Sequence, residues 1–89
     1  VNMHQVDFTP TAANDLKRLN KPVAQRVFSK IRWLSENFSS LSPVSLTGQW
    51  SGVYKLRVGD YRVLYTFSKE KESITIHFVR HRREVYKMK

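Results

Sequence analysis

The chain has 89 residues, with 16 lysines and arginines against 7 acids and a formal net charge of +9 at pH 7. It contains no cysteine, which excludes disulfides and thiolate chemistry, and no apolar run approaches the ~20 residues of a membrane span. We therefore expect a single domain over residues 1–89, in the cytoplasm and without membrane association. A domain this basic is typical of a protein with a polyanionic partner.

The first predicted elements are a short strand and a helix. In the segment MHQVDF, Val6 and Phe8 lie on one face at the two-residue period of a strand. Thr9 and Pro10 then match an N-cap and a first helical position. This pattern predicts a helix that ends near Leu19.

A second helix is predicted from Pro22 to about Phe38. Its apolar positions recur at steps of three and four and form one buried stripe: Val23, Val27, Ile31, Leu34 and Phe38. Trp33 lies off this stripe, which leaves two interpretations: it packs at the edge of the helical hairpin, or it is exposed and contacts a partner. Arg26 is expected to lie away from any functional face.

Residues 39–52 are rich in Ser, Gly and Pro and are expected to form a connecting loop. Three strands are predicted after it, at 53–58, 61–67 and 74–80. The order of elements predicts an α+β fold, with a two-helix hairpin packed on one face of a largely antiparallel sheet. That sheet is expected to contain the short N-terminal strand and a three-stranded C-terminal meander.

Alternation along these strands separates an apolar face from a cationic one. The apolar face is expected to pack beneath the helices. Ile74, Ile76 and Phe78 of the last strand are expected to lie in the same core. Its other members are Tyr54, Leu56, Val58, Tyr61, Val63, Tyr65 and Phe67. The opposite face carries Lys55, Arg57, Arg62 and Leu64.

The stretch YKLRVGDYRVLY predicts a tight hairpin with Gly59–Asp60 as its turn, which places Arg57 directly opposite Arg62. Like charges in that position destabilise a strand pair. Two interpretations account for the pair. The side chains splay apart in solvent, or a phosphate lies between their guanidinium forks.

No metal-ligand cluster, glycine-rich phosphate loop or nucleophile elbow is present, so neither a metal nor a cofactor is expected. The remaining Arg, Lys, His and Tyr side chains suit the cleavage of RNA by its own 2′-OH. A protein then needs only to orient the phosphate, stabilise the anionic transition state and move two protons. His81 and Tyr86 are the candidates for proton transfer. Alternatively, His81 stacks or caps the strand end, and Tyr86 packs at the sheet edge.

Three stretches, LKRLNKPVAQRVFSKIRWL, LTG…YKLRVGDYRVLYTF and HRREVYK, together resemble the RelE toxins of type II toxin–antitoxin pairs. The resemblance implies a microbial-ribonuclease-like RelE fold. It also implies cutting of translated messenger RNA in the ribosomal A site, so that translation stops. The implied partners are the ribosome and its messenger, a cognate antitoxin, and operator DNA only through the toxin–antitoxin complex.

By position, the resemblance implies four catalytic residues: Arg62, Arg82 (or Arg83 if the register slips), Tyr86 and Lys55. The residues themselves add His81 as a further catalytic candidate, and the basic side chains around the set are expected to bind RNA: Arg57, Arg80, Arg83 and Lys87. Two positions depart from the family pattern. Val53 stands where a second strand lysine is common, which puts the catalytic rate in doubt, and Arg80 replaces a glycine before the basic tail.

Two other functions stay open at this point. The ParE toxins, which poison DNA gyrase, share the fold that the resemblance implies. They generally lack the Arg and Tyr residues that carry RNA cleavage. A non-catalytic module that binds its antitoxin and acts as a co-repressor is the other alternative. Retention of Arg62, Arg82 and Tyr86 favours RNA cleavage.

Overall fold

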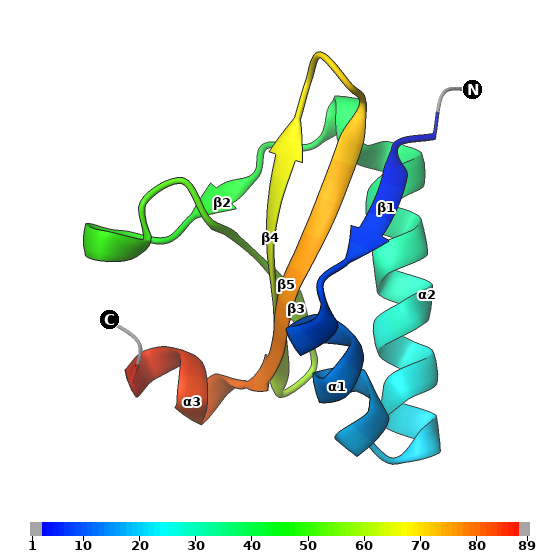
Figure 1. The fold of residues 1–89 in the computed structure, drawn as a ribbon, viewed down its shortest axis with the longest axis vertical. Helices are drawn as coiled ribbons and strands as arrows, with labels where there is room; N and C mark the ends of the chain where they lie inside the picture. The colour runs from blue at the N-terminus through cyan, green and yellow to red at the C-terminus, as the bar shows by residue number, and fades with distance from the viewer. Residues whose placement is uncertain (1–2, 88–89) are drawn as a thin grey trace.

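A computed structural model describes residues 3–87 as helices packed on a five-stranded sheet of order β1-β5-β4-β3-β2 (Figure 1). The strands are β1 (Gln5–Phe8), β2 (Val44–Ser45), β3 (Tyr54–Val58), β4 (Tyr61–Ser68) and β5 (Ser73–His81). The helices are α1 (Pro10–Arg18), α2 (Lys21–Asn37) and α3 (Arg82–Lys87), with 3₁₀ turns η1 (Phe38–Ser40) and η2 (Gly48–Trp50). β1 is parallel to β5, and the other neighbouring strands are antiparallel.

The two long helices begin where the sequence predicts. The Thr9 hydroxyl accepts a hydrogen bond from the Ala12 amide at 3.1 Å, and the Asn20 side chain accepts one from the Val23 amide at 3.0 Å. Each cap satisfies an amide that has no partner inside its helix. Both helices therefore have defined starts, and α2 begins at Lys21, one residue before the expected Pro22.

The main core lies between these helices and one face of the sheet, as predicted. Val27, Ile31 and Leu34 of α2 are buried against Val63 and Tyr65 of β4. Burial of Tyr65, together with the neighbouring Tyr54 hydroxyl, raises the pKa of the Tyr65 phenol to about 12. Figure 1 shows α1 and α2 on this side of the sheet.

Four elements were not expected from the sequence. The loop at 39–52 contains η1, the short strand β2 and η2. The basic tail forms the helix α3 rather than a simple extension of the last strand. Residues 46–53 and α3 contribute to a second, smaller core on the far face of the sheet, which consists of Leu46, Trp50, Val53, Leu64, Phe78 and Val85.

A register shift in β5 moves Phe78 away from its expected position. Leu64 pairs with Phe78 while Tyr65 pairs with Ile76, so His77 is an extra residue in the strand. The expectation that Phe78 joins Ile76 in the helix-covered core is therefore wrong, because the bulge reverses the alternation. Phe78 packs in the second core instead.

Over the described part of the chain, no helix is both long and apolar enough to cross a membrane.

Candidate functional site

The face of the sheet opposite α1 and α2 brings together several of the predicted site residues. Lys55 and Leu64 are cross-strand partners, and Arg62 lies two residues from Leu64 on the same side of β4. Val85 of α3 is 3% exposed and packs in the same cluster as Leu64. Val85 therefore anchors α3, the helix that carries Tyr86, against this face of the sheet. We call the surface formed by Lys55, Arg62 and α3 the cationic face.

Arg62 is positioned by the hairpin turn that precedes it. Gly59 has a φ of +58°, a conformation that glycine adopts without steric cost and that begins a type II′ turn. The Arg62 Nη1 atom donates to the Gly59 and Tyr61 carbonyls, both at 2.9 Å. The Nε and Nη2 groups have no hydrogen bond to another described residue. Together they form the edge of the guanidinium that can donate two parallel hydrogen bonds to a phosphate.

The predicted opposition of Arg57 and Arg62 is confirmed by the register of β3 and β4. The structure also shows how the repulsion is relieved. Arg62 folds onto the turn carbonyls, whereas Arg57 is exposed and borders a hollow beside Trp33 of α2. The two guanidinium groups therefore lie in different surroundings: that of Arg62 is hydrogen-bonded to the turn, and that of Arg57 faces the hollow.

The C-terminal helix contributes most of the remaining predicted residues. The Arg82 amide donates to the Asp60 carbonyl at 2.8 Å, and Arg82 Nε lies 3.9 Å from the Asp60 carboxylate. This contact ties the start of α3 to the hairpin turn. Arg83 and Lys87 are exposed, and Tyr86 is 59% exposed.

His81 is not directed toward the cationic face. It pairs with Tyr61, and its ring meets the Tyr61 ring edge-on at 5.5 Å between centroids. Tyr61 alternates with the core residue Val63, so both rings lie toward the α1 side of the sheet. His81 Nδ1 accepts from the Arg83 amide at 3.2 Å, which makes His81 the cap of α3.

Arg80 has a structural partner that the sequence analysis missed. Its Nε atom donates to Asp15 Oδ2 of α1 at 2.8 Å, and the same oxygen accepts from the Val79 amide at 3.0 Å. Asp15 is 5% exposed. An acid on the apolar stripe of a helix, between Ala12 and Leu16, was the available signal. Part of the charge of Arg80 is therefore neutralised inside the fold.

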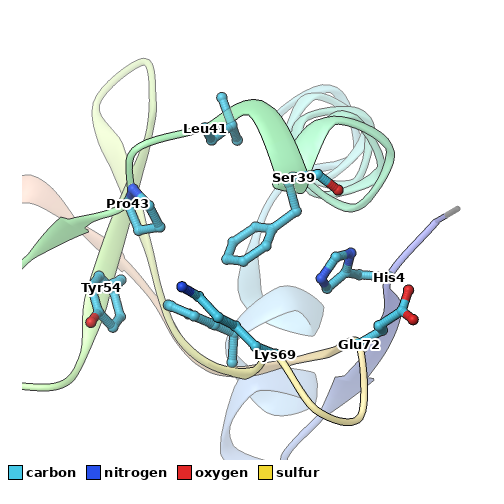
Figure 2. Close-up of a pocket in the computed structure, with 9 residues that line it drawn as sticks. His4, Ser39, Leu41, Pro43, Tyr54, Lys69 and Glu72 are labelled. Carbon is cyan, nitrogen blue, oxygen red and sulfur yellow. The ribbon is translucent and has the colours of Figure 1, made fainter.

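A cavity of about 620 Å³ lies beside η1 (Figure 2). His4, Tyr54, Lys69 and Glu72 line it, together with Phe38 and Phe67. The His4 ring meets Phe38 at 4.9 Å between centroids, and its Nδ1 atom is buried without a hydrogen-bond partner among the described residues. None of the predicted site residues borders this cavity, so the predicted chemistry does not gather there.

The comparisons with known proteins agree with this architecture. Among solved structures, a chain of the RelBE2 toxin–antitoxin complex from Mycobacterium tuberculosis is 28% identical, with a TM-score of 0.81 over 91% of this chain and 93% of that one. The isolated RelE toxin of E. coli is 24% identical, with a TM-score of 0.73 over 96% and 93% of the two chains. The archaeal RelE–RelB complex from Pyrococcus horikoshii is 23% identical, with a TM-score of 0.72 over 90% and 96%. The expected RelE fold is therefore confirmed.

The sequence itself was also compared with families and with curated proteins. No curated protein matches it. Residues 6–86 match the family described as the ParE toxin of the type II toxin–antitoxin system parDE. This match covers nearly the whole chain and agrees with the RelE-type structures. The chain therefore belongs to the ParE toxin family, and is a type II toxin of the RelE/ParE superfamily.

Proposed function

We propose that this toxin is an endoribonuclease that cuts translated messenger RNA in the ribosomal A site and so inhibits translation. The observation that supports the proposal is the packing of Val85 in one cluster with Leu64, because it docks α3, which carries Tyr86, against the face that bears Arg62 and Lys55. A phosphate-binding fork, a second cation and a phenol then share one side of the sheet. This is the set of groups that cleavage by a 2′-OH requires.

The roles follow from the geometry. The free edge of Arg62 holds the scissile phosphate, and Lys55 adds positive potential beside it. Tyr86 accepts the 2′-OH proton while the 2′-oxygen attacks phosphorus; the bond to the 5′-oxygen breaks and leaves a 2′,3′-cyclic phosphate. Arg82 stabilises the departing 5′-oxygen, which takes up a proton. Tyr86 is favoured over His81 as the base because His81 lies toward α1 and caps α3.

A cognate antitoxin is the proposed protein partner. Solved relatives from Mycobacterium tuberculosis and Pyrococcus horikoshii are toxin–antitoxin complexes. With 16 basic against 7 acidic residues, this chain is suited to an acidic or amphipathic antitoxin segment that neutralises the cationic face. We further propose that the pair acts in the cytoplasm and that operator DNA is bound only through the complex.

Inhibition of DNA gyrase is the second candidate function, and the match to the ParE family favours it. One experiment separates the two. The toxin is induced in a growing culture, and protein synthesis, messenger ends and plasmid supercoiling are followed together. RNA cleavage predicts an early stop in translation with cuts inside reading frames. Loss of supercoiling while translation continues would establish gyrase inhibition instead.

Site variants then test the proposed roles on ribosomes programmed with messenger. Tyr86→Phe is expected to reduce the single-turnover cleavage rate by about 100-fold or more, as for loss of a general base. Arg62→Lys keeps the charge but lacks the fork and should also be strongly impaired. Arg32→Ala is the matched control, because Arg32 is exposed on α2 and pairs with Glu36. A Tyr86→Phe protein that cuts at the normal rate would rule out the assigned base.

A further inference from the structure

Two adjoining hollows lie between β3 and α2, along the edge of β3 that pairs with β2 only at Tyr54 and Lys55. The first, of about 630 Å³, extends from Pro22 to the hairpin turn at Gly59. The second, of about 510 Å³, extends along β3 to the loop at 41–44. Three residues border both hollows, so that they form one continuous groove: Lys30, Trp33 and Arg57. We call it the β3-edge groove.

The β3-edge groove is lined by basic side chains and by no acid. The basic side chains are Arg26, Lys30, Lys55, Arg57 and Arg62. None of them forms an ion pair with another described residue, whereas the observed ion pairs engage Arg32, Arg80 and Arg82. The cationic surplus of the chain is therefore concentrated where no internal acid neutralises it.

Trp33 gives this groove an aromatic surface. The side chain is 38% exposed on the outer side of α2. Lys30 Nζ lies over one face of the ring, 4.0 Å from its centroid, so a stacking base uses the opposite face or displaces this ammonium group. A planar ring flanked by ammonium and guanidinium groups is the combination by which proteins bind single-stranded nucleic acids, with bases on the ring and phosphates on the cations.

We propose that the β3-edge groove binds single-stranded RNA, with a base stacked on Trp33 and the adjoining phosphates on Arg26, Lys30 and Arg57. Lys55 and Arg62 belong both to this groove and to the cationic face, so one strand can pass from Trp33 to the proposed scissile phosphate. The passage of the strand to the scissile phosphate rests on the proposed function, whereas the binding of RNA at Trp33 does not. The groove then holds the messenger beside the cleavage position.

An acidic protein segment is the competing occupant. The observations favour RNA because the groove offers an accessible aromatic ring among cations, with fork-shaped donors at Arg26 and Arg57. Phosphates use such forks in a bidentate way, and every nucleobase has a face that can stack. The groove is also continuous with the residues proposed to hold a phosphate.

The test uses a fluorescent 2′-O-methyl oligonucleotide, which cannot be cut by 2′-OH attack, so that binding is measured apart from cleavage. In fluorescence anisotropy, Trp33→Ala is expected to weaken binding by about five- to a hundredfold, the loss of one stacked base. Trp33→Tyr should retain much of the affinity and guards against a folding defect. Phe28→Ala is the control, since Phe28 is an exposed aromatic on α2 that packs against Phe8.

The salt dependence of the same binding reports the phosphate contacts. Arg26→Ala and Arg57→Ala should each reduce the slope of log K against log salt by about 0.7, the value for one phosphate of a single strand. Arg32→Ala, on the same helix but paired with Glu36, should leave the slope unchanged.

The outcomes separate the two proposals. If Trp33→Ala and Arg26→Ala bind like the unmodified protein while Arg62→Lys does not, RNA is held on the cationic face alone and the groove proposal fails. If the groove variants lose oligonucleotide binding but the unmodified toxin cuts no messenger on ribosomes, the groove proposal stands and the proposed cleavage fails. Binding of polyglutamate that depends on Trp33, with oligonucleotide binding unaffected, would assign the groove to an acidic protein.

Discussion

Arg62 and Arg80 are neighbours across β4 and β5, yet the fold uses them differently. Arg80 donates to the buried Asp15, so part of its hydrogen-bonding capacity holds α1 against β5. Arg62 uses only its Nη1 atom for the turn carbonyls and keeps its outer edge for a ligand. The two arginines therefore differ in how many guanidinium donors remain for a ligand, and Arg62 is the better phosphate site.

Tyr65 gives a prediction at the same scale. Its folded-state pKa of about 12 lies above the ordinary value of 10, because burial disfavours the phenolate. Its contribution to stability is therefore fully present below pH 10 and is lost as pH rises from 10 to 12. The free energy of unfolding should fall by about 2–3 kcal/mol across that window from this residue.

Urea denaturation at several alkaline pH values measures this loss. Tyr65→Phe should remove the contribution, so that its stability declines less than that of the unmodified protein. Tyr86→Phe is the control, because Tyr86 is exposed, and it should follow the unmodified protein. Parallel pH curves for Tyr65→Phe and the unmodified protein would contradict the assignment.

At the scale of elements, α3 shows how a short helix can be held by tertiary contacts. Six residues are too few to form a stable helix alone in water. The His81 cap, the Arg82–Asp60 contact and the burial of Val85 supply what the local sequence does not. The position of Tyr86 therefore depends on packing of the second core.

This dependence predicts a coupled loss of stability and activity. Val85→Ala should lower the free energy of unfolding by about 1–2 kcal/mol, because it leaves space against Leu64 and Leu46. If the proposed function holds, it should also slow cleavage, since small displacements of a catalytic group are costly. Met3→Ala is the control, since Met3 is 53% exposed and borders neither hollow of the β3-edge groove. Unchanged urea midpoints for both variants would show that α3 does not depend on Val85.

For the whole molecule, the distribution of charge is more informative than its total of +9. The observed ion pairs lie on α2, at the α1–β5 contact and at the hairpin turn. Five of the cations that form no ion pair with another described residue border the β3-edge groove: Arg26, Lys30, Lys55, Arg57 and Arg62. Arg26 lies on α2, outside the cationic face as expected, and it borders the β3-edge groove.

An anion that occupies these surfaces should stabilise the native state by mass action. Low millimolar sulfate is expected to raise the melting temperature more than chloride at equal ionic strength. Arg57→Ala and Arg62→Lys should each reduce the difference, whereas Arg32→Ala should not. Low concentration limits the general stabilisation by excluded sulfate. Equal responses to both salts would show that the cations are only solvated.

The sequence by itself determined the helical hairpin, the main core and the register of the β3–β4 hairpin. These features depend on local signals: caps at Thr9 and Asn20, a regular apolar stripe on α2, and a glycine suited to the turn. Because such signals act between residues close in the chain, they can be read before the fold is known. The placement of Lys55 and Arg62 on one face follows from the same signals, whereas the superfamily was implied by the resemblance of three sequence stretches to RelE toxins.

Only the tertiary structure decided which side chains meet on that face. The bulge at His77 reverses the alternation in β5, and the second core joins Leu46 of the loop after β2, Leu64 of β4 and Val85 of α3, which are far apart in the chain. Asp15 and Arg80 are likewise 65 residues apart. Packing between distant segments leaves no periodic signal in either one. For that physical reason His81 was grouped with Tyr86 in sequence, although the fold turns His81 toward α1 and carries Tyr86 on α3, whose Val85 packs in the second core on the opposite face.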